Sequence, residues 1–210
     1  MKLWIASYPR SGNTFVRLIL NEAFGIKSTS VYPSESGAMK ERPWLVERIG
    51  FTDAERPNEW LAVKTHDTPT DDGPAIYLVR DGRAAIASYR HMLNDFTDLR
   101  PDLPNLIRGE TWPGSWTDHF RAWNPEERSN TLLLRYEEMK DDPASVCRKI
   151  GAFLKIDQIA TFEQQFEELH ALEPALFRVA SNEKNIAEMQ PHIALFDDFH
   201  APLMRRLGYY

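Results

Sequence analysis

A short polar loop near the N-terminus carries residue types that bind anions. The segment Pro9-Arg10-Ser11-Gly12-Asn13-Thr14 joins an apolar run to a helical pattern. Gly12 permits close approach of the backbone, and the unpaired N–H groups and dipole at a helix start attract anions. Ser11, Asn13 and Thr14 add donors, and Arg10 adds a charged fork. The loop predicts anion binding, although the same residue types also cap ordinary helices.

The loop lacks the signature of the common nucleotide-binding loops. ATP- and GTP-binding loops of the form G-x-x-x-x-G-K-[ST] place a lysine on the phosphates and a hydroxyl on Mg²⁺. This loop has a single glycine and no Gly-Lys pair. That argues against a nucleotide-dependent kinase, which is kept as the alternative enzyme class.

A lysine and a histidine two residues apart, Lys64 and His66, form a second group that could do chemistry. In an extended segment, residues two apart point to the same side, so both can face one cleft. A histidine can take a proton near neutral pH, and an ammonium group can steady negative charge. We interpret His66 as a candidate general base; the alternative for His66 is a structural role. For Lys64, the alternative to a role in charge stabilisation is a solvated surface lysine.

Apolar runs and helical patterns alternate along the chain around these residues. Strands are predicted at four short runs: 3–7, 61–64, 75–79 and 131–134. Helical spacing is found in six segments: 14–24 (with Gly25 as its stop), 84–93, 116–123, 143–154, 159–170 and 194–207. Residues 26–60 are predicted to be irregular apart from a helix near 44–49, and 95–114 to form a long surface loop.

This alternation indicates an α/β fold: one P-loop-like domain over residues 1–210, with a central parallel sheet flanked by helices. Ligands in such sheets bind beyond the carboxyl ends of the strands. The polar residues fall at those ends, at 8–14, 64–66, Arg80 and Tyr136.

Four segments in the expected order resemble the cytosolic-type sulfotransferase family, which uses 3′-phosphoadenosine 5′-phosphosulfate (PAPS). Residues 8–14 resemble its 5′-phosphosulfate loop, and Lys64-Thr65-His66 resembles its catalytic Lys-x-His. Residues 77–89 resemble its 3′-phosphate segment, which carries an Arg and a Ser eight positions apart. The stretch 114–139 resembles the one that leads to its nucleotide-contacting Tyr.

The resemblance implies transfer of a sulfuryl group from PAPS to a hydroxyl or amine of a small acceptor, without a metal. It implies catalytic roles for His66 as general base, for Lys64 and for Arg10. The residues implied to bind PAPS, or its product PAP, are Arg10, Ser11, Gly12, Asn13, Thr14, Phe15, Arg80, Ser88, Tyr136 and Arg178.

Two positions depart from the family pattern. Phe15 stands where the family commonly has a Trp beneath the adenine, and any aromatic face can stack there. The late Arg-Lys-Gly segment that wraps the 3′-phosphate is absent, and only Arg178 matches it. Tight PAPS binding is therefore left open, and a non-catalytic PAP-binding protein is the further alternative.

The composition restricts the other possibilities. A net charge of -6 argues against nucleic-acid binding. The single cysteine, Cys147, is expected in the core and suits a reducing compartment. The apolar runs are too short for a signal peptide or a membrane span, so a cytoplasmic location is predicted. The spacing of His192, Asp197, Asp198 and His200 fits no compact metal motif.

Two loop segments are expected to shape the pocket for the acceptor. Residues 28–58 and 95–115 offer Trp44, Phe96 and Trp112 as apolar walls, which favours an apolar or aromatic acceptor. The identity of the acceptor and the oligomeric state, a homodimer included, are left open by the sequence.

Overall fold

A computed structural model describes residues 1–54, 58–163, 166–174 and 182–210 of the chain. The chain divides into two compact units. Unit 1 contains Met1–Ser7, Gly12–Val79 and Trp123–Gln164, and unit 2 contains Tyr8–Ser11, Arg80–Ala122 and Gln165–Tyr210. Neither unit is a continuous segment, because the chain passes from one to the other several times.

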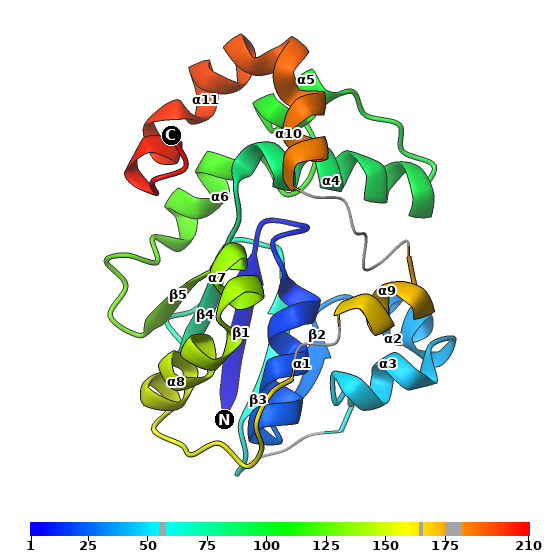
Figure 1. Cartoon of the computed structure of the whole chain (residues 1–210), viewed down its shortest axis with the longest axis vertical. Helices are drawn as coiled ribbons and strands as arrows, with labels where there is room; N and C mark the ends of the chain where they lie inside the picture. The colour runs from blue at the N-terminus through cyan, green and yellow to red at the C-terminus, as the bar shows by residue number, and fades with distance from the viewer. Residues whose placement is uncertain (55–57, 164–165, 175–181) are drawn as a thin grey trace. The chain divides into compact units, whose positions relative to one another are not determined.

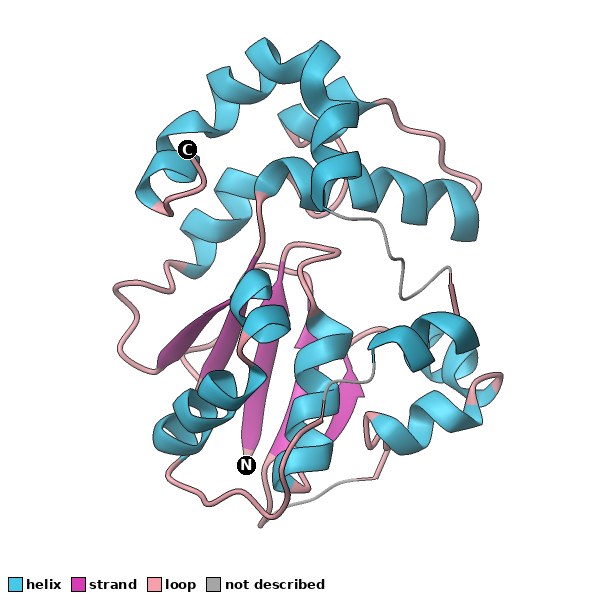
Figure 2. Ribbon diagram, in the orientation of Figure 1, coloured by secondary structure: helices cyan, strands magenta, loops and turns pink. Residues whose placement is uncertain are grey.

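Unit 1 is built around a five-stranded parallel sheet (Figures 1 and 2). Its strands are β1 (Lys2–Ser7), β2 (Lys27–Ser30), β3 (Leu61–Thr65), β4 (Ala75–Val79) and β5 (Thr131–Arg135), in the spatial order β2-β3-β1-β4-β5. All neighbouring strands are parallel. The predicted α/β fold, with a central parallel sheet flanked by helices, is confirmed. Because β3 and β4 flank β1, its carboxyl end is a switch point of the kind where such sheets bind ligands.

Burial of the strands explains which of them could be predicted from the sequence. All of β4 and the last five residues of β1 are buried, and continuous apolar runs are typical of parallel strands covered on both faces. The edge strand β2 has the sequence KSTS, of which only Ser28 is buried. The prediction of irregular structure at residues 27–30 was wrong. The strand was not predicted because strands were assigned from apolar runs, and β2 contains no apolar side chain.

The helices of unit 1 are α1 (Asn13–Phe24), α2 (Pro33–Lys40), α3 (Pro43–Arg48), α7 (Tyr136–Asp141) and α8 (Pro143–Leu154). Figure 1 shows α1, α7 and α8 over the same face of the sheet. The predicted helices α1, α3 and α8 are confirmed, and α1 ends at Gly25 as expected. The prediction missed α2 and α7. Proline begins α2 and α3, because the first turn of a helix needs no N–H donor at that position.

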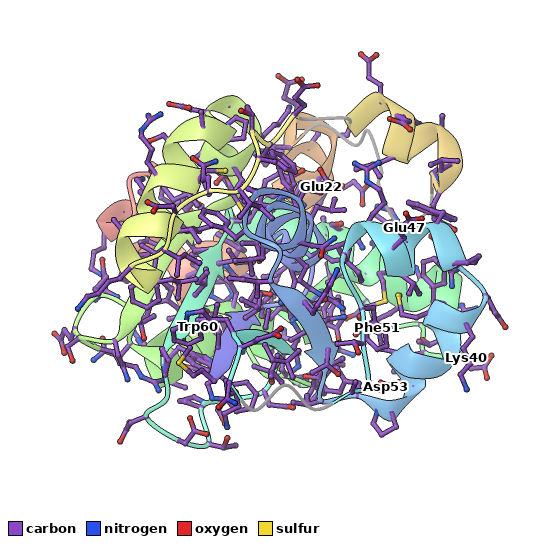
Figure 3. The ribbon with its side chains drawn as sticks, turned by 90° about the horizontal axis from the view of Figure 1, so that it is seen from below. Glu22, Lys40, Glu47, Phe51, Asp53 and Trp60 are labelled. Atoms are coloured by element: carbon purple, nitrogen blue, oxygen red, sulfur yellow. The ribbon has the colours of Figure 1, made fainter. Side chains whose placement is uncertain are left out.

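Polar contacts join the second half of α1 to α3. Arg48 Nε donates to Glu22 Oε1 at 2.6 Å. Asn21 Nδ2 donates to the backbone oxygens of Glu47 and Arg48 at 3.1 and 3.0 Å. Glu22 and Glu47 are labelled in Figure 3, where the molecule is seen from below. These contacts anchor α3 on α1.

Unit 2 is helical. Its elements are α4 (Gly82–Phe96), α5 (Leu103–Arg108), α6 (Trp116–Trp123, whose last residue belongs to unit 1), α9 (Phe166–Leu172), α10 (Asn182–Met189), the 3₁₀ turn η1 (Gln190–His192) and α11 (Ile193–Arg206). Asp81 caps α4 by accepting from the backbone N–H of Arg83. Trp116 packs so closely on Gly82 that a Cβ there would lie 2.9 Å from its ring. The predicted helix at 159–170 was misplaced, because residues 159–163 are not helical and α9 begins at Phe166.

The short helix α5 interrupts the segment predicted as one long surface loop. The Asp102 carboxylate accepts from the backbone N–H of Asn105 at 2.8 Å, and Pro104 lies in the first turn. Leu106 and Ile107 are fully buried. The prolines suggested a loop, but proline is compatible with a first helical turn, so the prediction was wrong for 103–108.

Two expectations from composition concern individual helices. Cys147, on α8, is buried, as predicted for a core residue. Burial raises the pKa of its thiol, which keeps it protonated and poorly reactive. Within the described ranges, no helix is both long enough and apolar enough to cross a membrane.

Candidate active site

The predicted anion-binding loop leaves the carboxyl end of β1 and leads into α1. Gly12 is the N-cap of α1 and has a φ angle of 101°, in the left-handed region that favours glycine. A Cβ here would lie 2.8 Å from Tyr136 Cδ2 and 2.7 Å from Met139 Cε. Unit 1 therefore brings two predicted cofactor residues, Gly12 and Tyr136, into direct contact, and only glycine allows this approach.

The polar side chains of the loop have different surroundings. Asn13 Nδ2 donates to the backbone oxygen of Ile5 at 3.0 Å, so this amide ties α1 to β1. The half-buried ring of Phe15 packs 5.9 Å from that of Phe162. Ser11 is fully buried, and its hydroxyl has no hydrogen-bond partner among the described residues. Because an unpaired buried hydroxyl is costly, Ser11 is the loop side chain best suited to donate to a bound anion.

In unit 2, Arg10 contacts two other predicted anion-binding residues, Ser88 and Arg80. Arg10 Nε donates to Ser88 Oγ at 3.1 Å, and Arg80 Nη1 donates to the backbone oxygen of Arg10 at 3.0 Å. Arg80 also donates from Nε and Nη2 to Asn182 Oδ1, at 3.1 and 2.6 Å. Arg80 is only 6% exposed, so its guanidinium is a largely desolvated positive charge with a fixed orientation. The predicted Arg178 lies outside the described residues.

Asn182, which orients Arg80, was not predicted from the sequence. The two residues are 102 positions apart, and Asn182 opens α10, a helix that was not predicted. A polar residue at a helix start is ordinarily interpreted as a cap, so the sequence contains no signal for its contact with an arginine.

His66 follows β3 and is held by the backbone of β1. Its Nδ1 lies 2.8 Å from the backbone oxygen of Ser7 and 3.3 Å from Ser7 Oγ. A carbonyl oxygen only accepts, so Nδ1 must carry the proton in this contact. In the neutral imidazole the remaining lone pair is then on Nε2, which is the form that a general base requires.

A tyrosine that the sequence analysis did not single out fixes the segment around His66. The backbone N–H of His66 donates to Tyr32 Oη at 2.7 Å, and Tyr32 Oη donates to Asp67 Oδ2 at 3.1 Å. The two rings are stacked, with centres 6.1 Å apart and planes at 16°. Burial raises the pKa of Tyr32 to about 12, so its hydroxyl stays protonated and keeps both contacts.

Lys64 lies in a partly buried charge cluster with Glu35 and Arg17, which were not predicted as site residues. Lys64 Nζ donates to Glu35 Oε2 at 2.7 Å, and Arg17 Nη1 donates to Glu35 Oε1 at 2.6 Å. The exposed fractions of these side chains are 19% for Lys64, 10% for Glu35 and 1% for Arg17. The solvated-lysine alternative is therefore excluded for Lys64.

Two of the four residues considered near the C-terminus, His200 and Asp197, have hydrogen-bond partners of their own. His200 Nε2 lies 3.1 Å from the backbone oxygen of Ile107, and its Nδ1 lies 2.8 Å from Thr117 Oγ1. The Tyr210 hydroxyl donates to Asp197. In the part of the chain that the structure describes, no three His, Cys, Asp or Glu side chains are grouped to hold a metal ion. Since Nε2 must donate to the carbonyl and Nδ1 can then accept from Thr117, His200 is a neutral buried histidine.

Mild acid is expected to destabilise the protein through His200. Burial lowers the pKa of His200 to about 4, from an unperturbed value of about 6.5. The unfolded chain therefore takes up this proton at a higher pH than the folded chain. The free energy of unfolding should fall as the pH decreases from about 6.5 to about 4, by at most about 3 kcal/mol, with no contribution from His200 at higher pH.

Urea denaturation across this pH range would measure the effect. His200→Gln keeps an amide donor but cannot take up a proton, so the variant should lack this part of the pH dependence. The same pH dependence in both proteins would contradict the prediction.

Sequence comparisons identify the family. A parallel α/β fold with an anion-binding loop after its first strand defines a broad class of phosphate- and nucleotide-binding proteins. Residues 1–175 match the family model described as the sulfotransferase domain, and the chain belongs to this family. It is 31% identical over 176 residues to sulfotransferase 1B1 of Mus musculus and 38% identical over 173 residues to sulfotransferase 2A1 of Rattus norvegicus. These alignments cover 71% and 72% of the chain but only 57% and 58% of the relatives, so the chain spans less than two thirds of their length.

Solved structures support the fold. The mouse sulfotransferase SULT7A1 complexed with PAP matches 83% of this chain and 64% of its own, with a TM-score of 0.56 and 22% identity. A retinol dehydratase in complex with androsterone and PAP matches 81% of this chain and 63% of its own, with a TM-score of 0.54 and 19% identity. At these identities the similarity concerns the architecture alone.

Proposed function

We propose that this chain, as a single sulfotransferase-like domain over residues 1–210, transfers a sulfuryl group from PAPS to a hydroxyl or amine of a small acceptor. Its membership of the sulfotransferase domain family and the names of its relatives support this activity. PAP in two solved structures of similar fold supports the cofactor, and androsterone in one of them supports a small apolar acceptor. The cytoplasmic location stays a prediction.

The polar residues fit an anionic nucleotide. In unit 1 the first turn of α1, from Gly12 to Phe15, would hold the 5′-phosphosulfate, and Tyr136 would contact the adenine. Arg10, Ser11, Arg80 and Ser88 belong to unit 2. The family resemblance assigns Arg10 and Ser11 to the phosphosulfate and Arg80 and Ser88 to the 3′-phosphate. The buried hydroxyl of Ser11, which lacks a partner among the described residues, and the desolvated charge of Arg80 support this assignment. Arg178 stays a proposed contact on the strength of the family resemblance alone.

The observation that carries the proposed chemistry is the contact between His66 Nδ1 and the backbone oxygen of Ser7. It leaves the lone pair of the neutral imidazole on Nε2, where it can take the proton of an acceptor hydroxyl. Bound PAPS supplies the sulfuryl group. Lys64 and Arg10 would stabilise the negative charge that develops as the group leaves, and positioning of charges is the main source of catalysis in such transfers.

PAP and PAPS are expected to bind without added metal. The arginines and the helix start supply the positive charge that a divalent cation would otherwise provide. Calorimetric titration with PAP in EDTA would measure this binding, and ATP with Mg²⁺ in a parallel titration tests the kinase alternative. No binding of PAP at millimolar concentration, or a preference for ATP with Mg²⁺, would contradict the assignment.

Transfer itself is tested with labelled PAPS against a panel of phenols, steroids, amines and sugars. Labelled product with at least one acceptor class would support the activity. PAP binding without transfer to any of them would favour a non-catalytic PAP-binding protein.

A further inference from the structure

The N-cap and the first turn of α2 contact the two residues of the Lys64–His66 pair. Tyr32, just before α2, accepts from the backbone N–H of His66, and Glu35, three residues later, accepts from Lys64 Nζ. The backbone N–H of Glu35 donates to the Tyr32 carbonyl at 3.0 Å, which closes the turn. The residue that contacts His66 and the residue that contacts Lys64 are therefore joined by a backbone hydrogen bond within one turn. We propose that Glu35 is a positioning residue for Lys64: it holds the ammonium group in the orientation in which Lys64 would stabilise charge on the leaving phosphate.

The buried side of Glu35 is firmly anchored. Arg17, which binds the other carboxylate oxygen, also donates from Nε to Ser28 Oγ at 3.0 Å. Ser28 Oγ in turn donates to the backbone oxygen of Ile49 at 2.8 Å. The guanidinium carbon of Arg17 lies 5.7 Å from the centre of the Phe51 ring, labelled in Figure 3. Because Arg17 is only 1% exposed, the carboxylate is fixed from the core side and presents its second oxygen to Lys64.

The electrostatics favour a positioning role over proton transfer. Burial would raise the pKa of Glu35, but the nearby charges of Lys64 and Arg17 outweigh it and lower this pKa to about 2. The carboxylate is therefore ionised at all physiological pH values and is a very weak base. Lys64 sits beside a permanent negative charge, which restrains its long side chain in one orientation. The restraint reduces the conformational entropy that Lys64 would otherwise lose in the reaction.

This inference rests on the proposed function of Lys64, and the decisive variant is Glu35→Gln. The amide is the same size but carries no charge. A hydrogen bond to a charged group contributes about 1.5–3 kcal/mol, so we expect kcat to fall about ten- to a hundredfold. The KM for the acceptor should change little. In a Lys64→Ala background, Glu35→Gln should cause no further loss of rate, because residues that act through one another are not additive.

A second measurement does not depend on activity. The Lys64 ammonium group is expected to give a resolved ¹H–¹⁵N NMR signal in the wild type, assigned by its absence in Lys64→Ala. The signal should be shifted or lost in Glu35→Gln. Glu22→Gln, which removes the 2.6 Å ion pair with Arg48 at the other end of α1, is the matched control and should leave both rate and signal unchanged.

The remaining outcomes also distinguish a positioning role of Glu35 from a purely structural one. If Glu35→Gln fails to fold because Arg17 loses its counter-charge, Glu35→Asp keeps that charge while withdrawing the carboxylate from Lys64, and the same loss of rate and signal is expected. An unchanged Lys64 signal, or additive losses in the double variant, would show that Glu35 is merely structural. If the wild type transfers no sulfuryl group to any acceptor, the proposed function fails, while the NMR result still decides whether Glu35 holds Lys64.

Discussion

Replacing His66 with alanine is expected to lower turnover by about 10²–10⁴-fold, the usual contribution of a positioned general base. His66 is held with Nδ1 on the backbone oxygen of Ser7, so its remaining lone pair is on Nε2. It would act on the acceptor, and the affinity for PAP should therefore be nearly unchanged. Steady-state kinetics on a verified acceptor, together with calorimetric titration of PAP, would separate the two effects.

The controls for His66 use a second histidine and the neighbouring lysine. His192→Ala, on η1, should leave turnover unchanged. Lys64→Ala should slow turnover and also weaken the binding of PAPS, because the lysine would touch the leaving phosphate.

Wild-type activity should fall in acid, since a protonated imidazole has no lone pair to accept a proton. Near-normal turnover of His66→Ala would refute its role, and the family resemblance would then support binding only.

Replacing Arg80 with alanine is expected to weaken PAP about ten- to a hundredfold, the loss of one charge-assisted contact. Adenosine 5′-phosphosulfate, which lacks the 3′-phosphate, should be affected far less. Arg80 is 6% exposed and is oriented by Asn182 Oδ1 and by the backbone oxygen of Arg10, so its charge is desolvated and directed. Competition titrations with the two ligands would measure the selectivity.

A matched arginine tests whether the loss is specific to Arg80. Arg90 lies on α4, which begins two residues after Arg80, and pairs with Glu188 at 2.9 Å, so Arg90→Ala should leave the affinities for both ligands unchanged. If Arg178 takes the place of the missing Arg-Lys-Gly segment, Arg178→Ala should also weaken PAP more than adenosine 5′-phosphosulfate. Equal losses for the two ligands in Arg80→Ala would mean that this residue does not bind the 3′-phosphate.

Local sequence patterns were sufficient for the central features of unit 1. The apolar runs of β1 and β4, the single glycine before α1 and the two-residue spacing of Lys64 and His66 each depend on neighbouring positions only. They predicted a parallel α/β fold with polar residues at the carboxyl ends of its strands. Proline misled the same reasoning at α2 and α5, because its effect depends on its position within the turn.

The partners of the candidate residues were decided by the tertiary structure alone. His66 contacts Ser7 across 59 positions, Lys64 contacts Glu35 across 29, and Arg80 contacts Asn182 across 102. The polar edge strand β2, which leads to α2, had no pattern of its own. Periodicity identifies which face of a segment is apolar, but a polar side chain is matched to a partner only when the folded backbone brings two distant segments together. The sequence by itself therefore determined the fold class and the residue types of the site, and only the packed chain determined the tautomer of His66 and the charges that hold Lys64 and Arg80.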